Sequence, residues 1–177
     1  GDVYKRQEQG TLPYLSVRPL KRGVFFLLFH ATHLLWLELT FLLSGLLLLG
    51  VGFWLQVPGI SGLAVPFLLA QAAGLLAFSS LSAVAGMLTR RYLVLGLLYG
   101  AIIEVGVGGI PTNVNVLSLA HHVRVVASMS ETASAFLVSN QGSAALSACV
   151  LIAVGLIGAG IAAFMYTWRE FIASQDA

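Results

Sequence analysis

Glu38 and Glu104 lie inside long apolar runs of the sequence and are the first candidates for chemistry. An ionised side chain in hydrocarbon is costly, so such residues usually face a protein interior or a cavity. Glu104 could therefore line a substrate path or hold helices together at a subunit interface. The alternative is a protonated or hydrogen-bonded carboxyl group that fixes helix packing, and the sequence leaves both readings open.

Histidines near these residues raise the question of a metal centre. His30 and His33 share a run with Glu38, but a spacing of five does not place His33 and Glu38 on one helical face, and no H-E-x-x-H motif is present. We expect the two histidines to lie near the cytoplasmic entry of a helix and reach the lipid headgroups. No metal site is predicted.

A second group, His121-His122-x-Arg124, could suggest zinc or phosphate binding. Adjacent histidines point to different faces of a helix, and neither Cys nor a carboxylate is close in sequence. The expectation is a solvated face on an outer helix. Ser143 and Ser147 lack the paired His and Asp that would activate a nucleophile, so no catalytic site is predicted.

ATP hydrolysis is excluded for the chain itself. A P-loop requires G-x-x-x-x-G-K-[ST], and the two lysines, Lys5 and Lys21, lie in no such frame. No cofactor is predicted, and an energy source based on ATP would need a separate subunit.

The composition assigns these residues to a membrane protein. Of 177 residues, 58% are hydrophobic and 9% are charged, against about 25% charged in soluble domains. Basic residues sit at the ends of apolar runs and form no stripe, so no nucleic-acid partner is expected. The single Cys149 excludes an intrachain disulfide.

The predicted fold class is all-α, a polytopic membrane helix bundle. A bilayer core about 30 Å thick needs about 20 helical residues. Four apolar runs satisfy or approach that length and form one transmembrane domain over 24–171; they are 24–56, 62–88, 92–109 and 144–168. Pro58-Gly59, Arg90-Arg91 and Gly108-Gly109 end the first three runs. Residues 172–177 are expected to be a cytoplasmic tail.

The outer loop, 110–143, contains apolar residues at helical spacing. They are Val116, Leu119, Ala120, Val123 and Ala127. Asn115, Ser118, His122 and Ser130 fall largely on other faces, which predicts an amphipathic helix that is interfacial or re-entrant. In the last run, Gly155, Ala159 and Ala163 recur every four residues, a spacing that permits close helix contact within the chain or with a partner.

Basic residues predict the orientation. Four spans place residues 1–23, the Arg90-Arg91 turn and the C-terminus on one side, which carries eight of the nine Lys and Arg residues. Loops rich in Lys and Arg remain cytoplasmic. Both ends of this piece are therefore expected in the cytoplasm, with Trp54 and Trp168 at opposite interfaces, and the location is predicted to be a prokaryotic cell membrane.

The segment EQGTLPYLSVRPLKR, residues 8–22, resembles the cytoplasmic segment after the second span in permease subunits of type-two ATP-binding-cassette (ABC) exporters. The matching residues are Glu8, Gly10, Thr11, Leu12, Leu15, Arg18, Pro19 and Arg22. Leu97–Glu104 with its following Gly-Gly-Ile-Pro, the stretch Leu117–Arg124 and the ending Thr167–Phe171 are similar to later elements of the same family. Family members have six spans and this chain has four, so we interpret it as a fragment lacking the first two. Residues 1–7 resemble a translated adapter sequence, and we assign them no function.

The resemblance implies a permease subunit that pairs with a second permease subunit, homodimeric or heterodimeric, and with cytoplasmic ATP-binding subunits. Residues 8–22 would couple to the ATPase, and Glu38 and Glu104 would be polar residues of the pathway. The basic residues could instead pair with anionic lipid. Two other hypotheses stay open: a non-transporting four-span scaffold or assembly protein, and an intramembrane enzyme using Glu38, Glu104 and the histidines.

Overall fold

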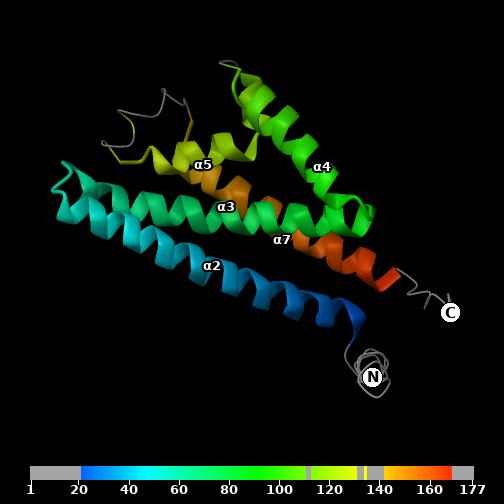
Figure 1. Ribbon diagram of the computed structural model, residues 1–177. Helices are drawn as coiled ribbons and strands as arrows, with labels where there is room; N and C mark the ends of the chain where they lie inside the picture. The colour runs from blue at the N-terminus through cyan, green and yellow to red at the C-terminus, as the bar shows by residue number, and fades with distance from the viewer. Residues whose placement is uncertain (1–20, 111–112, 131–133, 135–141, 169–177) are drawn as a thin grey trace.

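The computed structural model describes residues 21–110, 113–130, 134 and 142–168. Within these residues the chain is all-α, with five α-helices (Figure 1). The predicted coupling residues lie outside the described part; they are Glu8, Gly10, Thr11, Leu12, Leu15, Arg18 and Pro19.

Three helices are long and apolar enough to cross a membrane: α2, Arg22–Trp54, α3, Ile60–Leu88, and α7, Ala144–Trp168. Their bounds agree with three of the four predicted runs to within about two residues. Many of their large apolar side chains are exposed, such as Leu47 at 72% and Phe29 at 67%. Exposed apolar surface on this scale requires a nonaqueous environment or a partner.

The turn between α2 and α3 forms where the sequence predicts a break. Helix α2 ends at Trp54, and α3 begins after Gly59, whose φ of 77° lies in the left-handed region. A residue without Cβ adopts this conformation at no steric cost. Pro58 precedes it and has no backbone N–H to continue the α2 hydrogen-bond ladder.

The predicted third span differs from expectation. Residues 92–107 form α4, Tyr92–Tyr99, followed directly by the π-helix η1, Gly100–Val107. Together they are shorter than the other three apolar helices, so the part of the chain that the structure describes contains three membrane-length helices and does not show the predicted four. The glycines at 106, 108 and 109 and the following Pro111 limit how far this helix can extend, because both residue types weaken helices.

The predicted amphipathic helix forms as α5, Leu119–Ala127, preceded by the short 3-10 helix η2, Asn113–Leu117. Helix α5 packs against α3 and α7, and Figure 1 shows it running alongside α3 near the start of α7. Gly74, the middle residue of the 29-residue α3, faces Val123 of α5: a Cβ at position 74 would lie 3.0 Å from a Val123 methyl group. Contact with the centre of a membrane-length helix favours the re-entrant interpretation.

The expectation of a solvated face on α5 is wrong. His121 is 3% exposed and His122 is 4% exposed, and Ser118 and Ser130 are also buried. The polar side of this helix is covered because α3, α7 and the end of η1 surround it, and a single-sequence pattern cannot show that both faces have partners.

The core forms where α3, α5 and α7 meet. Ala70, Ala77, Leu119, Val126 and Leu151 make up this buried cluster. A second cluster, made by Phe26, Ala162 and Ala163, joins α2 to α7. Two of the three small residues predicted for close packing in α7 pack within the chain: Gly155 lies against Leu76, and Ala163 belongs to the second cluster. Gly158, which was not predicted, lies against Ser80.

One end of the bundle gathers the basic residues. The start of α2, the α3–α4 turn with Arg90 and Arg91, and the end of α7 lie at the same end of the molecule (Figure 1). The ring centroids of Phe26 and Tyr166 are 5.4 Å apart, which joins the first turns of α2 to the last turns of α7. Among the described residues, Lys21, Arg22, Arg90 and Arg91 therefore lie at one end of the bundle, and their cytoplasmic location stays a prediction.

Candidate functional site

Glu104 accepts four hydrogen bonds. The Tyr99 hydroxyl donates to Oε1 over 2.5 Å, and the Ser118 hydroxyl donates to Oε2 over 2.6 Å. The backbone N–H groups of Leu119 and Ala120 complete the set, over 3.1 and 2.8 Å. The carboxylate thus occupies the N-terminus of α5.

The π-helix places Glu104 where it can do this. Tyr99 and Glu104 are five residues apart, and the i→i+5 pattern of a π-helix puts such residues on one face. In a regular α-helix the two side chains would diverge. The π segment therefore turns both groups towards α5.

The backbone of η1 also comes close to the start of α5 at Gly108. A Cβ on Gly108 would collide with the carbonyl oxygen of Glu104 and would lie 2.7 Å from Oγ of Ser118. Only glycine permits η1 and the start of α5 to meet at this point. The carbonyl of Gly108 accepts a hydrogen bond from Arg124 over 3.1 Å, so α5 also holds η1 from its last turn.

Ser118 caps the same helix in the usual way, because its hydroxyl accepts from the N–H of His121 over 3.2 Å. Glu104 adds an acceptor for two further N–H groups and places a negative charge at the positive end of the helix dipole. Of the two readings left open by the sequence, this geometry favours the packing role. A pathway role for Glu104 stays a prediction.

The histidines of α5 also point into the protein. Nδ1 of His122 lies 3.1 Å from Oγ of Ser147 on α7, and its Nε2 lies 2.9 Å from the carbonyl oxygen of Val116. Ser147 thus bonds a neighbouring helix, and the sequence carried no signal for this pair, since the two residues are 25 positions apart.

His121 is buried beside these groups, and its Nδ1 has no hydrogen-bond partner within the described residues. Burial lowers the pKa of His121, and the neighbouring His122 and Arg124 lower it further. The imidazole is thus held in its neutral form near neutral pH.

His30 was expected to reach the headgroups and does not. It is buried, with its Nε2 3.3 Å from Oγ of Ser80 on α3. Its ring stacks on Phe26 with the centroids 6.0 Å apart. His30 therefore joins α2 to α3, while His33 is exposed.

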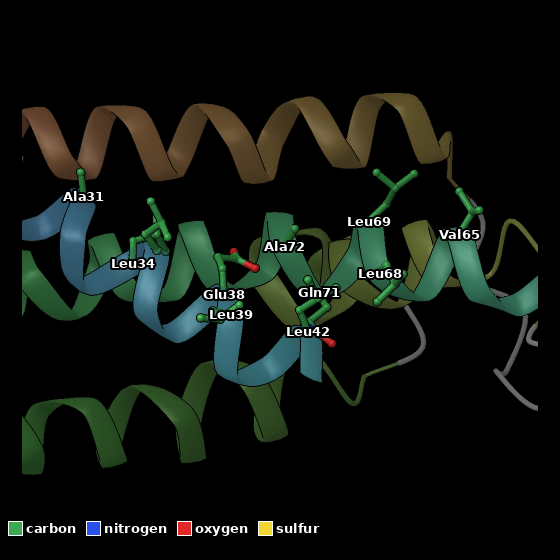
Figure 2. A pocket seen from close by; sticks show the side chains of 11 residues that line it. Ala31, Leu34, Glu38, Leu39, Leu42, Val65, Leu68, Leu69, Gln71 and Ala72 are labelled. Carbon is green, nitrogen blue, oxygen red and sulfur yellow. The ribbon is translucent and has the colours of Figure 1, made fainter. Parts of the chain in front are cut away.

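Glu38 lies in different surroundings from Glu104. It lines two adjoining apolar spaces, of about 710 and 540 Å³, that share Leu34, Leu69 and Ala72. Figure 2 shows its carboxylate beside α3, opposite Ala72. No hydrogen bond or ion pair of this carboxylate exists within the described residues. Glu38 and Glu104 are not brought together, because α2 and α4 lie on opposite sides of α3 (Figure 1).

A third space, of about 470 Å³, separates α3 from α4 and η1 and reaches Glu104. Its carboxylate is already bound to four donors, which leaves little acceptor capacity for a ligand. In the described part of the chain, no three His, Cys, Asp or Glu side chains lie close enough together to hold a metal ion.

The chain matches no protein-family model, no curated protein and no solved structure, so a function can be proposed only from its own residues.

Proposed function

We propose that the chain is a membrane-spanning permease subunit of an ATP-driven, ABC-type exporter, which forms a substrate pathway and couples to a separate ATPase subunit. In this proposal residues 92–107 act as a fourth, shorter span. The permease works with a second permease subunit, and the prokaryotic cell membrane is its location, with both ends of the piece in the cytoplasm.

The observation that supports the proposal most is the packing of α5 within the bundle. The resemblance implies an apolar run with a buried Glu, a Gly turn, an amphipathic helix and a last span, in that order. The described residues contain this succession, with Glu104 fixed to the N-terminus of α5. A helix capped and packed at the centre of α3 is suited to closing one end of a pathway between the longer helices.

Coupling is proposed for residues that precede α2 in the sequence: Glu8, Gly10, Thr11, Leu12, Leu15, Arg18 and Pro19. Motion of an ATPase docked there would reach α2 directly, because α2 starts at Arg22. The bundle contact between Phe26 and Tyr166 would pass that motion to α7.

Site-specific crosslinking tests the coupling proposal. A photo-reactive residue at Leu15, in cells that express the full-length gene with its neighbouring genes, should yield a covalent adduct with a protein that carries a Walker motif. The same residue at Leu47, which is 72% exposed on α2, serves as the lipid-facing control and should yield no such adduct. Labelling of only lipid or water from Leu15 would contradict coupling.

The second candidate is a non-transporting membrane scaffold. The many contacts among α3, α5 and α7 would suit it equally well, since a scaffold also needs a fixed bundle. Reconstitution of the permease with its ATPase separates the two: transport predicts ATP-dependent movement of a solute or lipid across the bilayer, and a scaffold predicts none.

A further inference from the structure

The two adjoining spaces around Glu38, here called the Glu38 groove, are built for one kind of ligand. Apart from Glu38 and Gln71, every side chain that lines them is apolar. Their volumes of about 710 and 540 Å³ lie within the range of about 300–1,000 Å³ that small-molecule sites occupy. The groove is open on one side and is large enough to hold a drug-sized apolar body.

The charge in the groove is unbalanced. Among the residues that the structure describes, no Lys, Arg or His lines either space. The outer stretch 131–143 contains none of these residues either, so it has no basic side chain to offer. An isolated carboxylate among aliphatic side chains is costly unless it is protonated or paired.

Gln71 contributes the second polar group. Its Oε1 lies against α2, where a Cβ on Gly45 would be only 3.0 Å away. Figure 2 shows Gln71 in the turn of α3 that also carries Ala72, close to Leu42 of α2. Carboxylate and amide oxygens are both acceptors, so the polar part of the groove favours a ligand that is positively charged or donates hydrogen bonds.

We propose that the Glu38 groove binds a lipophilic organic cation, with the Glu38 carboxylate as counter-ion and the aliphatic walls covering its apolar groups. As a statement about substrate class this rests on the proposed transport function. The binding itself needs neither ATP nor a second subunit.

Depth within the bundle suits such a ligand. Leu69 and Ala72 place the groove along the middle of α3, and Leu34 lines it from α2. Val126 and Met129, at and just after the end of α5, form another part of its wall. A cation carrying large apolar groups partitions into a bilayer and can reach this level from the lipid. A hydrophilic cation cannot, so the apolar walls and the single charge together select for both properties.

Binding of tetraphenylphosphonium to the full chain in phosphatidylcholine nanodiscs tests the proposal. Equilibrium dialysis should show saturable binding with about one site per chain. Glu38→Gln should weaken it at least about tenfold, which corresponds to loss of about 1.4 kcal/mol. Glu38→Asp keeps the charge and should retain most of the affinity.

Two controls test separately the charge of the ligand and the volume of the Glu38 groove. Tetraphenylborate has the same shape and the opposite charge, and it should show only non-saturable partition. Leu69→Trp fills both spaces and should abolish saturable binding with Glu38 intact, whereas Leu47→Trp, on an exposed part of α2 outside the groove, should not.

Equal binding by the wild-type chain and Glu38→Gln would overturn the proposal, as would saturable tetraphenylborate binding or no saturable binding at all. Far-ultraviolet circular dichroism on each variant confirms that the fold is retained. If the chain binds the cation but the reconstituted complex does not transport it, only the proposed transport function is contradicted. If Glu38→Gln leaves transport of the cation unchanged, only the proposed binding site is contradicted.

Discussion

At the scale of single residues, the two partly buried carboxylates, Glu38 and Glu104, have different surroundings. Glu104 accepts four hydrogen bonds, and Glu38 accepts none within the described residues. Because the sequence places both in apolar runs, composition and spacing could not distinguish them. The difference depends on which helix N-terminus lies nearby, which is a property of the folded chain.

Glu104→Gln should destabilise the start of α5. The amide has one acceptor oxygen instead of two and no charge to offset the helix dipole, so a loss of about 1–3 kcal/mol is expected. Hydrogen exchange in detergent should show faster exchange at the Leu119 and Ala120 amides. Glu38→Gln is the matched control: it removes the same charge with no loss of a hydrogen bond, and should leave these amides unchanged. Equal exchange in wild type and Glu104→Gln would contradict the capping role.

His121 should make the stability of the fold depend on pH. Its pKa is lowered in the folded chain, so the unfolded chain binds more protons once the pH falls below the ordinary value of about 6.5. The contribution of the neutral imidazole is fully present above that pH and is lost on acidification. The melting temperature in detergent should therefore fall between pH 7.5 and pH 5, and His121→Gln should show a smaller fall. An identical pH dependence in both chains would contradict the assignment.

At the scale of elements, helix packing depends on where side chains are missing. In α7, a Cβ at Gly155 would come within 2.5 Å of Leu76, whereas nothing lies within 4 Å of a Cβ at Gly160. The two glycines sit in the same helix and differ only in what they face. Gly155 lies at the α3–α7 contact, and Gly160 lies on the exposed side of α7.

This difference predicts opposite effects for one substitution. Gly155→Ala should lower stability by about 1–3 kcal/mol, because overpacking forces α3 and α7 apart. Gly160→Ala should raise stability by up to about 1 kcal/mol, since Ala is the better helix former. Thermal unfolding in one detergent measures both. A stabilising Gly155→Ala would show that α7 and α3 are not in the close contact described.

The long helices were predictable from the sequence, whereas the π-helix and the burial of α5 were not. Apolar runs bounded by Pro58-Gly59 and Arg90-Arg91 determine the limits of α2 and α3, because these residues act locally. The π-helix around Glu104 and the burial of α5 depend on contacts between distant segments. Sequence periodicity predicted that α5 forms, but it predicted the wrong surroundings for His121 and His122.

At the scale of the whole molecule, the arrangement of the helix ends predicts a sided protein. Arg22, Arg90 and Arg91 lie at one end, and the α2–α3 turn lies at the other (Figure 1). Under the rule that basic loops stay in the cytoplasm, the turn at 55–59 should face outwards.

Cysteine labelling in intact cells measures this orientation. In a Cys149→Ala background, Val57→Cys should react with a membrane-impermeant maleimide added outside. Arg91→Cys should react only after the membrane is permeabilised. Labelling of Arg91→Cys in sealed cells would reverse the topology, and labelling of both would contradict a sealed three- or four-span arrangement.

The length of α2 has a consequence for the surrounding membrane. Its 33 residues extend for about 50 Å, while the hydrocarbon of an average bilayer is about 30 Å thick. A tilt of up to about 40°, the upper end of the observed range, does not absorb this mismatch. Either the ends of α2 emerge among the headgroups, or the lipids beside it stretch. Stretching favours longer acyl chains, and in that case the protein should sort towards the thicker patches of a mixed membrane.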